Sequence, residues 1–202
     1  MMDERHLAFL IADVSDKGVP AALFMMSAKD LINYRASLGG TPGEILMAVN
    51  NQLARDNKNL MFVTIWMGIL NLDSGEVTFA CAGHEPQAVI AEDGNVVMWE
   101  NHDYNPAIGL FTGMKFIDYN TRLKAGESIF LYTDGVVEAM SGSEKFYGRE
   151  RMIDTLSRTG GKDPEATVLS VRSDIESFVG EAVQFDDLTM VCVKYYGTEG
   201  KG

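Results

Sequence analysis

Basic charge, cysteine and long apolar runs are all scarce in this sequence. Its 202 residues include 17 Lys and Arg against 29 Asp and Glu, which gives a formal net charge of −12. Because nucleic-acid backbones and anionic membrane surfaces bind basic faces, this balance argues against both as partners. No run of about 18 apolar residues occurs, so we expect no transmembrane helix. Residues 1–5 are charged and lack the apolar core of a signal peptide.

Cysteine is limited to Cys81 and Cys192, and each lies in an apolar run that predicts a strand. Two such residues do not make a disulfide framework, and their surroundings favour buried thiols over metal ligands or a disulfide. Buried thiols are typical of a reducing compartment, so we expect a cytoplasmic protein. The sequence also lacks a nucleophile elbow, a Cys-centred phosphate loop and a Gly-x-x-x-x-Gly-Lys phosphate cradle.

The hydrophobic pattern changes several times along the chain. A short apolar run at residues 6–12 predicts a buried strand, and helix formers with Pro20 at their start predict a helix to residue 36. Thr41 and Glu44 form a capping box for a second helix that ends near Arg55. Three hairpins are predicted next, at residues 62–72 with 76–82, 87–91 with 96–99, and 116–123 with 128–132.

The C-terminal third predicts two further helices and a closing strand. The helices cover residues 149–158 and 164–179, the second with Asp163 as its cap, and the strand covers 188–195. Helix pairs separated by a block of strands favour an α+β architecture over a doubly wound sheet. We expect residues 1–196 to form a single domain and residues 197–202 to be a flexible tail.

Acidic residues recur where predicted strands end or begin. Asp13 follows the first strand, Asp134 follows the strand at 128–132, and Asp186 with Asp187 precedes the last strand. Such carboxylates can converge on one rim of a sheet, and hard cations such as Mg²⁺ and Mn²⁺ prefer oxygen ligands. Each aspartate taken alone also fits a structural turn, as Asp134-Gly135 illustrates. A cation site and ordinary turns therefore both remain open at this point.

The local sequences around these aspartates resemble a known set of motifs. Five segments occur in the family's order: Ile11-Ala12-Asp13-Val14-Ser15-Asp16-Lys17-Gly18-Val19-Pro20-Ala21-Ala22-Leu23-Phe24-Met25, Cys81-Ala82-Gly83-His84-Glu85-Pro86, Pro106-Ala107-Ile108-Gly109-Leu110, Leu131-Tyr132-Thr133-Asp134-Gly135-Val136-Val137-Glu138-Ala139 and Phe185-Asp186-Asp187-Leu188-Thr189. Together they span nearly the whole chain. The sequence thus resembles the SpoIIE-type branch of the bacterial PPM (protein phosphatase 2C-like) metal-dependent Ser/Thr phosphatases.

The resemblance implies a fold and a metal centre. The fold is a four-layer α-β-β-α sandwich, in which two antiparallel sheets are flanked by helices. The centre holds two divalent cations, Mn²⁺ or Mg²⁺. By motif, Asp13 would bridge the cations, the Val14 carbonyl would bind one of them, and Asp134 and Asp186 would hold the other. Asp187 is then a supporting or structural residue. Two such cations activate a water molecule for attack on phosphorus, which needs no protein nucleophile.

The implied activity is hydrolysis of phosphoserine or phosphothreonine on a partner regulatory protein. An anti-sigma-factor antagonist is the expected substrate, and an upstream sensory or receiver domain is expected in the parent protein. The family carries a Gly-Gly-Asp-x-x-Asp strand before the position of Asp13, and this sequence begins after it. We therefore expect an N-terminally truncated catalytic domain that binds metal more weakly and exposes a strand edge that favours a homodimer.

Two alternatives compete with the phosphatase interpretation. The chain can be a catalytically silent phosphatase-like interaction module that recognises a partner without hydrolysis. A Ca²⁺-stabilised structural β domain would explain the aspartates but not the ordered motifs. The presence of Asp13, Asp134 and Asp186 together favours an enzyme, since a silent relative is expected to lose some of them.

Overall fold

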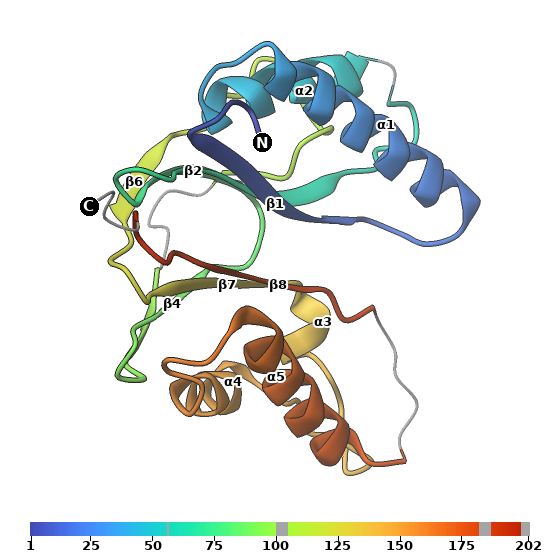
Figure 1. Cartoon of the computed structure of the whole chain (residues 1–202). Helices are drawn as coiled ribbons and strands as arrows, with labels where there is room; N and C mark the ends of the chain where they lie inside the picture. Colours follow the sequence, from blue (N-terminus) through green and yellow to red (C-terminus); the bar gives the residue numbers. More distant parts are fainter. Residues whose placement is uncertain (56, 100–104, 182–186, 199–202) are drawn as a thin grey trace. The chain divides into compact units, whose positions relative to one another are not determined.

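The computed structural model describes residues 1–55, 57–99, 105–181 and 187–198 (Figure 1). The chain divides into two compact units, residues 1–84 with 101–122 and residues 85–100 with 123–202. Each unit contains one four-stranded antiparallel sheet and its own helices. The predicted α+β class with two antiparallel sheets is therefore confirmed. The assignment of residues 1–196 to a single domain stays a prediction.

The first unit has the strand order β1-β2-β3-β6, with two helices packed on the sheet (Figure 1). The predicted first strand and both predicted helices are confirmed, and the strand continues two residues beyond its predicted end. The elements of this unit are β1 (His6–Val14), α1 (Val19–Ser37), α2 (Pro42–Arg55), β2 (Val63–Asn71), β3 (Glu76–Ala82) and β6 (Tyr119–Arg122).

The second unit has the strand order β5-β4-β7-β8 and carries three helices among its described residues. The hairpin at residues 87–99, both C-terminal helices and the closing strand are confirmed. Its elements are β4 (Ala88–Ile90), β5 (Val96–Met98), β7 (Ser128–Tyr132), α3 (Asp134–Val137), α4 (Arg149–Ser157), α5 (Pro164–Val179) and β8 (Met190–Lys194). The short helix α3 was not predicted.

The predicted hairpin between residues 116–123 and 128–132 is wrong. The first segment forms β6, which pairs with β3 through Glu76↔Arg122, while the second forms β7, which pairs with β4 and β8. The burial patterns explain why the two strands do not pair with each other. β7 is buried at all five positions, as a central strand must be, whereas β6 alternates between exposed and half-buried residues as an edge strand does.

The two helix caps predicted from sequence are both confirmed. The Thr41 backbone N–H donates to Glu44 Oε2 at 3.0 Å, and the Glu44 N–H donates to Thr41 Oγ1 at 3.3 Å. The Ala166 N–H donates to Asp163 Oδ1 at 2.8 Å. Each cap satisfies amide groups that the first turn of a helix leaves without partners. Local chemistry therefore fixes where α2 and α5 begin.

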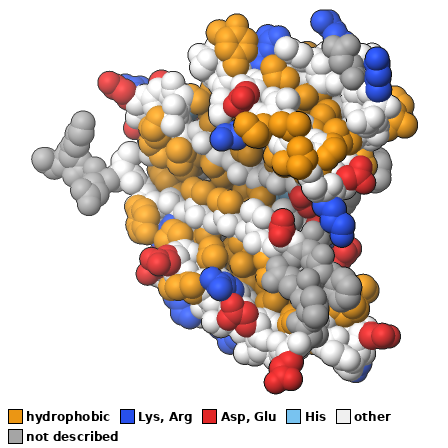
Figure 2. Space-filling view, turned by 90° about the vertical axis from the view of Figure 1, so that its right-hand side faces the viewer, with side chains coloured by type: hydrophobic (Ala, Val, Ile, Leu, Met, Phe, Trp, Pro, Cys, Tyr) orange, Lys and Arg blue, Asp and Glu red, His pale blue; other side chains and the backbone are white. Residues whose placement is uncertain are grey.

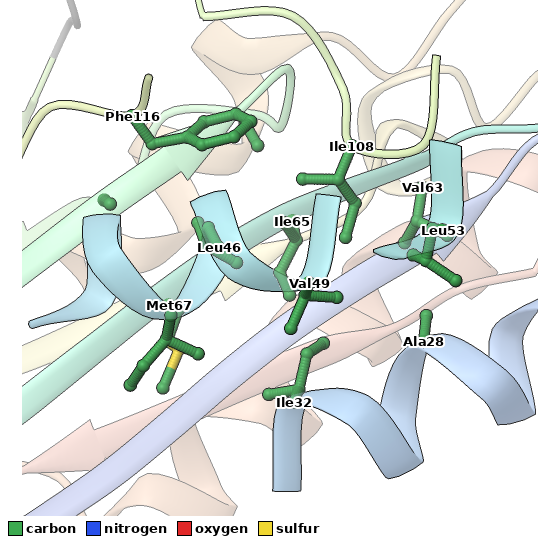
Figure 3. Close-up of a cluster of buried hydrophobic side chains, with 13 residues drawn as sticks. Ala28, Ile32, Leu46, Val49, Leu53, Val63, Ile65, Met67, Ile108 and Phe116 are labelled. Carbon is green, nitrogen blue, oxygen red and sulfur yellow. The ribbon is translucent and has the colours of Figure 1, made fainter. Parts of the chain in front are cut away.

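The core of the first unit lies between α2, α1 and the sheet (Figure 3). Alternate residues of β2 point toward the helices and meet one apolar face of α2, as the periods of strand and helix require. The labelled side chains that make this contact are Val63, Ile65 and Met67 from β2, Leu46, Val49 and Leu53 from α2, and Ala28 and Ile32 from α1. This packing makes β2 a firm support for the residues that flank its ends.

Both remaining sequence expectations about apolar segments can be checked on the described residues. In that part of the chain, no helix is long and apolar enough to cross a membrane. Cys81 lies buried in β3 and Cys192 lies half-buried in β8, and neither forms a disulfide. Burial raises the pKa of the Cys192 thiol to about 11, so this thiol is a poor nucleophile at neutral pH.

Candidate active site

Asp13 lies at the end of β1, in the first unit. It is paired with Thr64 of β2 and is half-buried. Beyond Val14, the strand ladder ends with two hydrogen bonds between Ser15 and Phe62, one from each backbone N–H. The chain then turns sharply through Asp16, whose φ of 65° lies in the left-handed region that aspartate tolerates better than most residues. Asp13 therefore occupies a fixed strand end just before a tight turn.

Thr64 connects the Asp13 backbone to His84. Its hydroxyl donates to the Asp13 carbonyl oxygen at 3.4 Å and lies 3.0 Å from His84 Nδ1. Because the hydroxyl has a single proton, Nδ1 of His84 carries the hydrogen when Thr64 donates to Asp13. The His84 carbonyl oxygen in turn accepts from Cys81 Sγ at 3.3 Å. His84 thus stabilises its own turn and contacts Thr64 next to Asp13. These contacts favour a structural role for His84.

Gly83 is required by the turn that presents His84. Its φ is 67°, and a Cβ at this position would lie 2.9 Å from the Ala107 backbone nitrogen. No other residue fits so close to a neighbouring backbone in that conformation. Two of the sequence motifs, those around Gly83 and around Ala107, are therefore packed against each other in the first unit.

Asp134 lies in the second unit, directly after the fully buried strand β7. It is the first residue of α3, its side chain is exposed, and its Oδ1 accepts from the Gly135 N–H at 2.9 Å. Thr133 ties this strand end to the segment before β8. Its N–H donates to the Thr189 carbonyl at 3.1 Å, its hydroxyl accepts from the Thr189 N–H at 3.3 Å and donates to the Asp187 carbonyl at 3.4 Å.

These contacts place two of the predicted acidic motifs side by side within the second unit. Asp187 is exposed and follows Asp186 directly, whereas Asp186 itself lies outside the described residues. The Asp13 carboxylate and the Val14 carbonyl belong to the first unit. The structure thus brings the Asp134 and Asp187 segments together, and the complete predicted ligand set is not tested.

The described carboxylates have the chemistry that divalent cations require. Asp13, at the end of β1, and Asp134, at the start of α3, both have carboxylate oxygens, which suit Mg²⁺ or Mn²⁺. Within the described ranges, no group of three or more histidine, cysteine or acidic side chains is arranged to hold a metal ion. The predicted set includes Asp186, which lies outside the described residues, so the predicted metal centre stays a prediction.

A charged cluster that sequence reasoning missed surrounds Tyr132, two residues before Asp134. Arg149 Nη2 donates to Glu85 Oε2 at 3.1 Å, and both groups lie near the buried ring of Tyr132. Burial and the negative charge of Glu85 raise the pKa of Tyr132 to about 12, so its hydroxyl stays protonated at neutral pH. The three residues are far apart in sequence. Only the position of Glu85 after His84 could have drawn attention to them.

Comparison with protein families gives one match over almost the whole chain. The model of the family described as Stage II sporulation protein E (SpoIIE) matches residues 3–196. The chain is also 28% identical over 220 residues to "Protein IcfG" of Synechocystis sp., covering 96% of this chain and 34% of that protein. It is 29% identical over 136 residues to "Phosphoserine phosphatase RsbU" of Bacillus subtilis, covering 67% of this chain and 40% of that protein.

Solved structures with the same fold come from several bacteria. The SiaA-PP2C domain of Pseudomonas aeruginosa has a TM-score of 0.82 at 19% identity, covering 94% of this chain and 79% of that chain. The RsbU and RsbW domains of Rv1364c from Mycobacterium tuberculosis give a TM-score of 0.79 at 24% identity, covering 96% of this chain and 53% of that chain. These likenesses establish the fold of this chain.

Proposed function

Because this chain belongs to the SpoIIE family, we propose that it is a metal-dependent protein phosphatase that hydrolyses phosphoserine or phosphothreonine on a partner protein. The observation that carries the proposal is the position of the motif aspartates. Asp13 lies at the end of β1, Asp134 begins α3 two residues after the buried strand β7, and the Asp187 segment is hydrogen-bonded to Thr133 next to Asp134. RsbU and a second relative from Bacillus subtilis, RsbP, which is 23% identical to this chain over 141 residues, are both named phosphoserine phosphatases, which supports the same reaction.

In this proposal, Asp13, the Val14 carbonyl, Asp134 and Asp186 hold two divalent cations, Mn²⁺ or Mg²⁺. A related structure, RsbX of 16% identity, was solved in complex with magnesium. When bound, such a cation pair supplies an activated water and neutralises charge on the phosphoryl group. The Asp13, Asp134 and Asp186 carboxylates are then the catalytic ligands of the reaction, since no nucleophilic side chain of the protein is required.

The surrounding residues of the chain have positioning roles. Thr64 holds the Asp13 backbone, and Thr133 holds the strand end that carries Asp134 against the Asp187 segment. Such preorganisation contributes to rate because ligands that are held in place need no rearrangement during the reaction. Asp187 acts in this scheme as a supporting residue and not as a ligand.

The partner and the parent protein are also proposals. This chain spans about two fifths or less of the curated relatives that it matches. We propose an anti-sigma-factor antagonist as the substrate. In one related structure, an RsbU domain occurs together with a second domain, RsbW, in the same protein. An upstream sensory or receiver domain and a homodimer complete the proposed assembly.

Hydrolysis of p-nitrophenyl phosphate tests the proposed chemistry. We expect turnover by this chain with Mn²⁺ or Mg²⁺, none with EDTA, and a loss of at least about a hundredfold in Asp186→Asn. Asp30→Asn, an exposed change on α1, is the matched control and should keep full activity. No turnover by the wild-type chain at any metal concentration would instead support a silent interaction module.

A further inference from the structure

Two exposed apolar side chains lie on the loops next to the end of β1. Leu60 is 68% exposed and Phe111 is 62% exposed. Leu60 precedes Phe62 by two residues, and Phe62 forms the two hydrogen bonds to Ser15 that close the strand ladder beyond Asp13. We call Leu60 and Phe111 the two tips.

One asparagine side chain joins the loops that carry the tips. Asn57 Nδ2 donates to the carbonyl oxygens of both Met61 and Gly109, and Asn57 Oδ1 accepts from the Met61 N–H at 3.1 Å. Gly109 has a φ of 104°, and a Cβ on it would lie 3.2 Å from the Met61 carbonyl oxygen. The two loops are therefore in direct contact, and the tips belong to one surface of the first unit.

The loop of Phe111 is fixed to α2 by two further asparagines. Asn50, which is fully buried, donates from Nδ2 to the Phe111 carbonyl at 2.8 Å and accepts at Oδ1 from the Gly109 N–H at 2.9 Å. Asn51 Oδ1 accepts from the Gly113 N–H at 2.7 Å. Three side-chain amides thus hold the backbone around the tips in one conformation. The backbone that carries the exposed Phe111 side chain is therefore fixed.

Leu60 adopts a conformation that a leucine rarely takes. Its φ is 53°, in the left-handed region, and it ends a turn closed by its own N–H on the Asn57 carbonyl. A residue with a Cβ atom is unfavourable there, and such strain persists where the surroundings enforce it, often at functional sites. The conformation of Leu60 is therefore energetically unfavourable, and its apolar side chain is nevertheless exposed to solvent.

The surface beside the tips is hollowed and includes one exposed lysine. An open recess between α1 and α2 has an apolar floor that includes Phe24, Leu53 and Met61, and Lys58 lies at its rim. Figure 2 shows one face of the molecule, on which apolar side chains gather in several patches between charged groups. In a chain of net charge −12, an exposed lysine between apolar groups suits a partner that carries phosphate next to an apolar patch.

We propose that Leu60 and Phe111 are specificity-determining residues that contact an apolar patch next to the phosphorylated residue of a folded protein substrate. The proposal rests on the proposed phosphatase function, because it places the substrate at the Asp13 end of the sheet. Apolar side chains on a backbone that is already held in one conformation lose less freedom on binding, and a few such anchors carry most of the affinity of a protein interface. Because p-nitrophenyl phosphate carries no protein surface that could contact the tips, the proposal predicts that its hydrolysis does not depend on them.

The test compares three substrates: the folded, serine-phosphorylated anti-sigma-factor antagonist, a phosphopeptide of about ten residues cut from it, and p-nitrophenyl phosphate. We expect the wild-type chain to prefer the folded protein to the peptide in kcat/KM. Leu60→Ser and Phe111→Ser should each lower kcat/KM on the folded protein by about tenfold to a hundredfold, mainly through KM. Activity on p-nitrophenyl phosphate should stay within about twofold.

Ile117→Ser is the matched control, since Ile117 is also exposed, at 45%, but lies beside the start of α2, where its neighbours Phe116 and Asp118 adjoin Gly43. It should leave all three substrates unaffected. Leu60→Gly adds an independent readout, because relief of the left-handed strain should raise the thermal midpoint while activity on the folded protein falls.

Three outcomes would overturn the proposal. One is an equal kcat/KM of the wild-type chain for the folded protein and for the peptide. Another is an unchanged kcat/KM of both tip variants for the folded protein. The third is an equal loss on p-nitrophenyl phosphate, which would indicate damage to the catalytic centre. A wild-type chain that hydrolyses none of the substrates would refute the proposed function itself, a result that is separate from these three.

Discussion

Replacement of Asp174 by Asn should destabilise the second unit more than any other single charge change on α5. Asp174 receives four hydrogen bonds from α4 and the segment before it. Arg151 donates from Nε and Nη2, each at 2.9 Å, Tyr147 donates from its hydroxyl at 2.7 Å, and Thr155 donates at 3.0 Å. The Asp174 side chain is 22% exposed and that of Arg151 is 41% exposed. The carboxylate thus fastens α4 to α5.

The expected magnitude follows from what the amide can no longer accept. An asparagine keeps one acceptor oxygen and turns an N–H₂ group toward a donor of Arg151. A hydrogen bond to a charged group contributes about 1.5–3 kcal/mol, and the partial exposure of Arg151 reduces the ionic part. We therefore expect a loss of about 2 kcal/mol in the free energy of unfolding. For a chain of this length, the thermal midpoint should fall by about 4–8 °C.

Urea unfolding followed by circular dichroism measures this loss directly. The matched control is Glu176→Gln, on the same helix, whose ion pair with Arg172 has side chains 59% and 62% exposed. An exposed pair of this kind contributes about 0.5 kcal/mol or less. Equal midpoints for Asp174→Asn and Glu176→Gln would refute the argument, because the reasoning depends on the extra hydrogen bonds of Asp174.

The pH dependence of the same variant gives the sign of the electrostatic contribution. Hydrogen bonds from Arg151 hold the pKa of the Asp174 carboxyl well below its usual range, although burial opposes them, and Tyr147 and Thr155 act in the same direction. A carboxyl with a lowered folded-state pKa stabilises the fold above its unfolded pKa of about 3.9 and loses this effect as the pH falls. The difference between wild type and variant should be constant above about pH 5 and shrink below it.

Three further substitutions are expected to change activity or stability. Thr64→Val removes the hydroxyl between the Asp13 carbonyl and His84, so p-nitrophenyl phosphate turnover should fall by about tenfold while circular dichroism stays native. Gly109→Ala introduces a Cβ at a φ of 104°, 3.0 Å from the Phe24 ring, and should lower the free energy of unfolding by about 1–3 kcal/mol in urea titrations. Asp163→Ala removes the cap of α5 and should cost about 1 kcal/mol in the same assay, whereas no loss would mean that solvent replaces the cap.

Features set by neighbouring residues were predictable from the sequence. The caps at Thr41 and Asp163 depend on contacts three residues apart, and the hairpin between β2 and β3 depends on the turn at residues 71–75. The helix caps and the hairpin are therefore determined by residues that are close together in the sequence. The sequence also predicted that Asp13 and Asp134 follow strands, because an apolar run stops shortly before each of these aspartates.

Features that depend on distant residues could not be predicted. The partners of β6 and β7 are set by burial across the sheet, so their closeness in sequence was misleading. Asn50 lies 61 residues before Phe111, and Asn57 lies 52 residues before Gly109, yet their amides position the loop beside Asp13. The left-handed conformation of Leu60 has no sequence signal, because leucine is not a residue that turns of this kind favour.

The most direct measurement of the central claim is phosphate release as a function of Mn²⁺ concentration, in the wild-type chain and in Asp13→Asn and Asp134→Asn. The account predicts a rate that rises with Mn²⁺ to saturation. In each variant, it predicts a higher Mn²⁺ requirement and a maximal rate at least about a hundredfold lower. Phosphate release that does not depend on a divalent cation, or variants that match the wild type at every Mn²⁺ concentration, would contradict the claim that these aspartates form the catalytic metal centre.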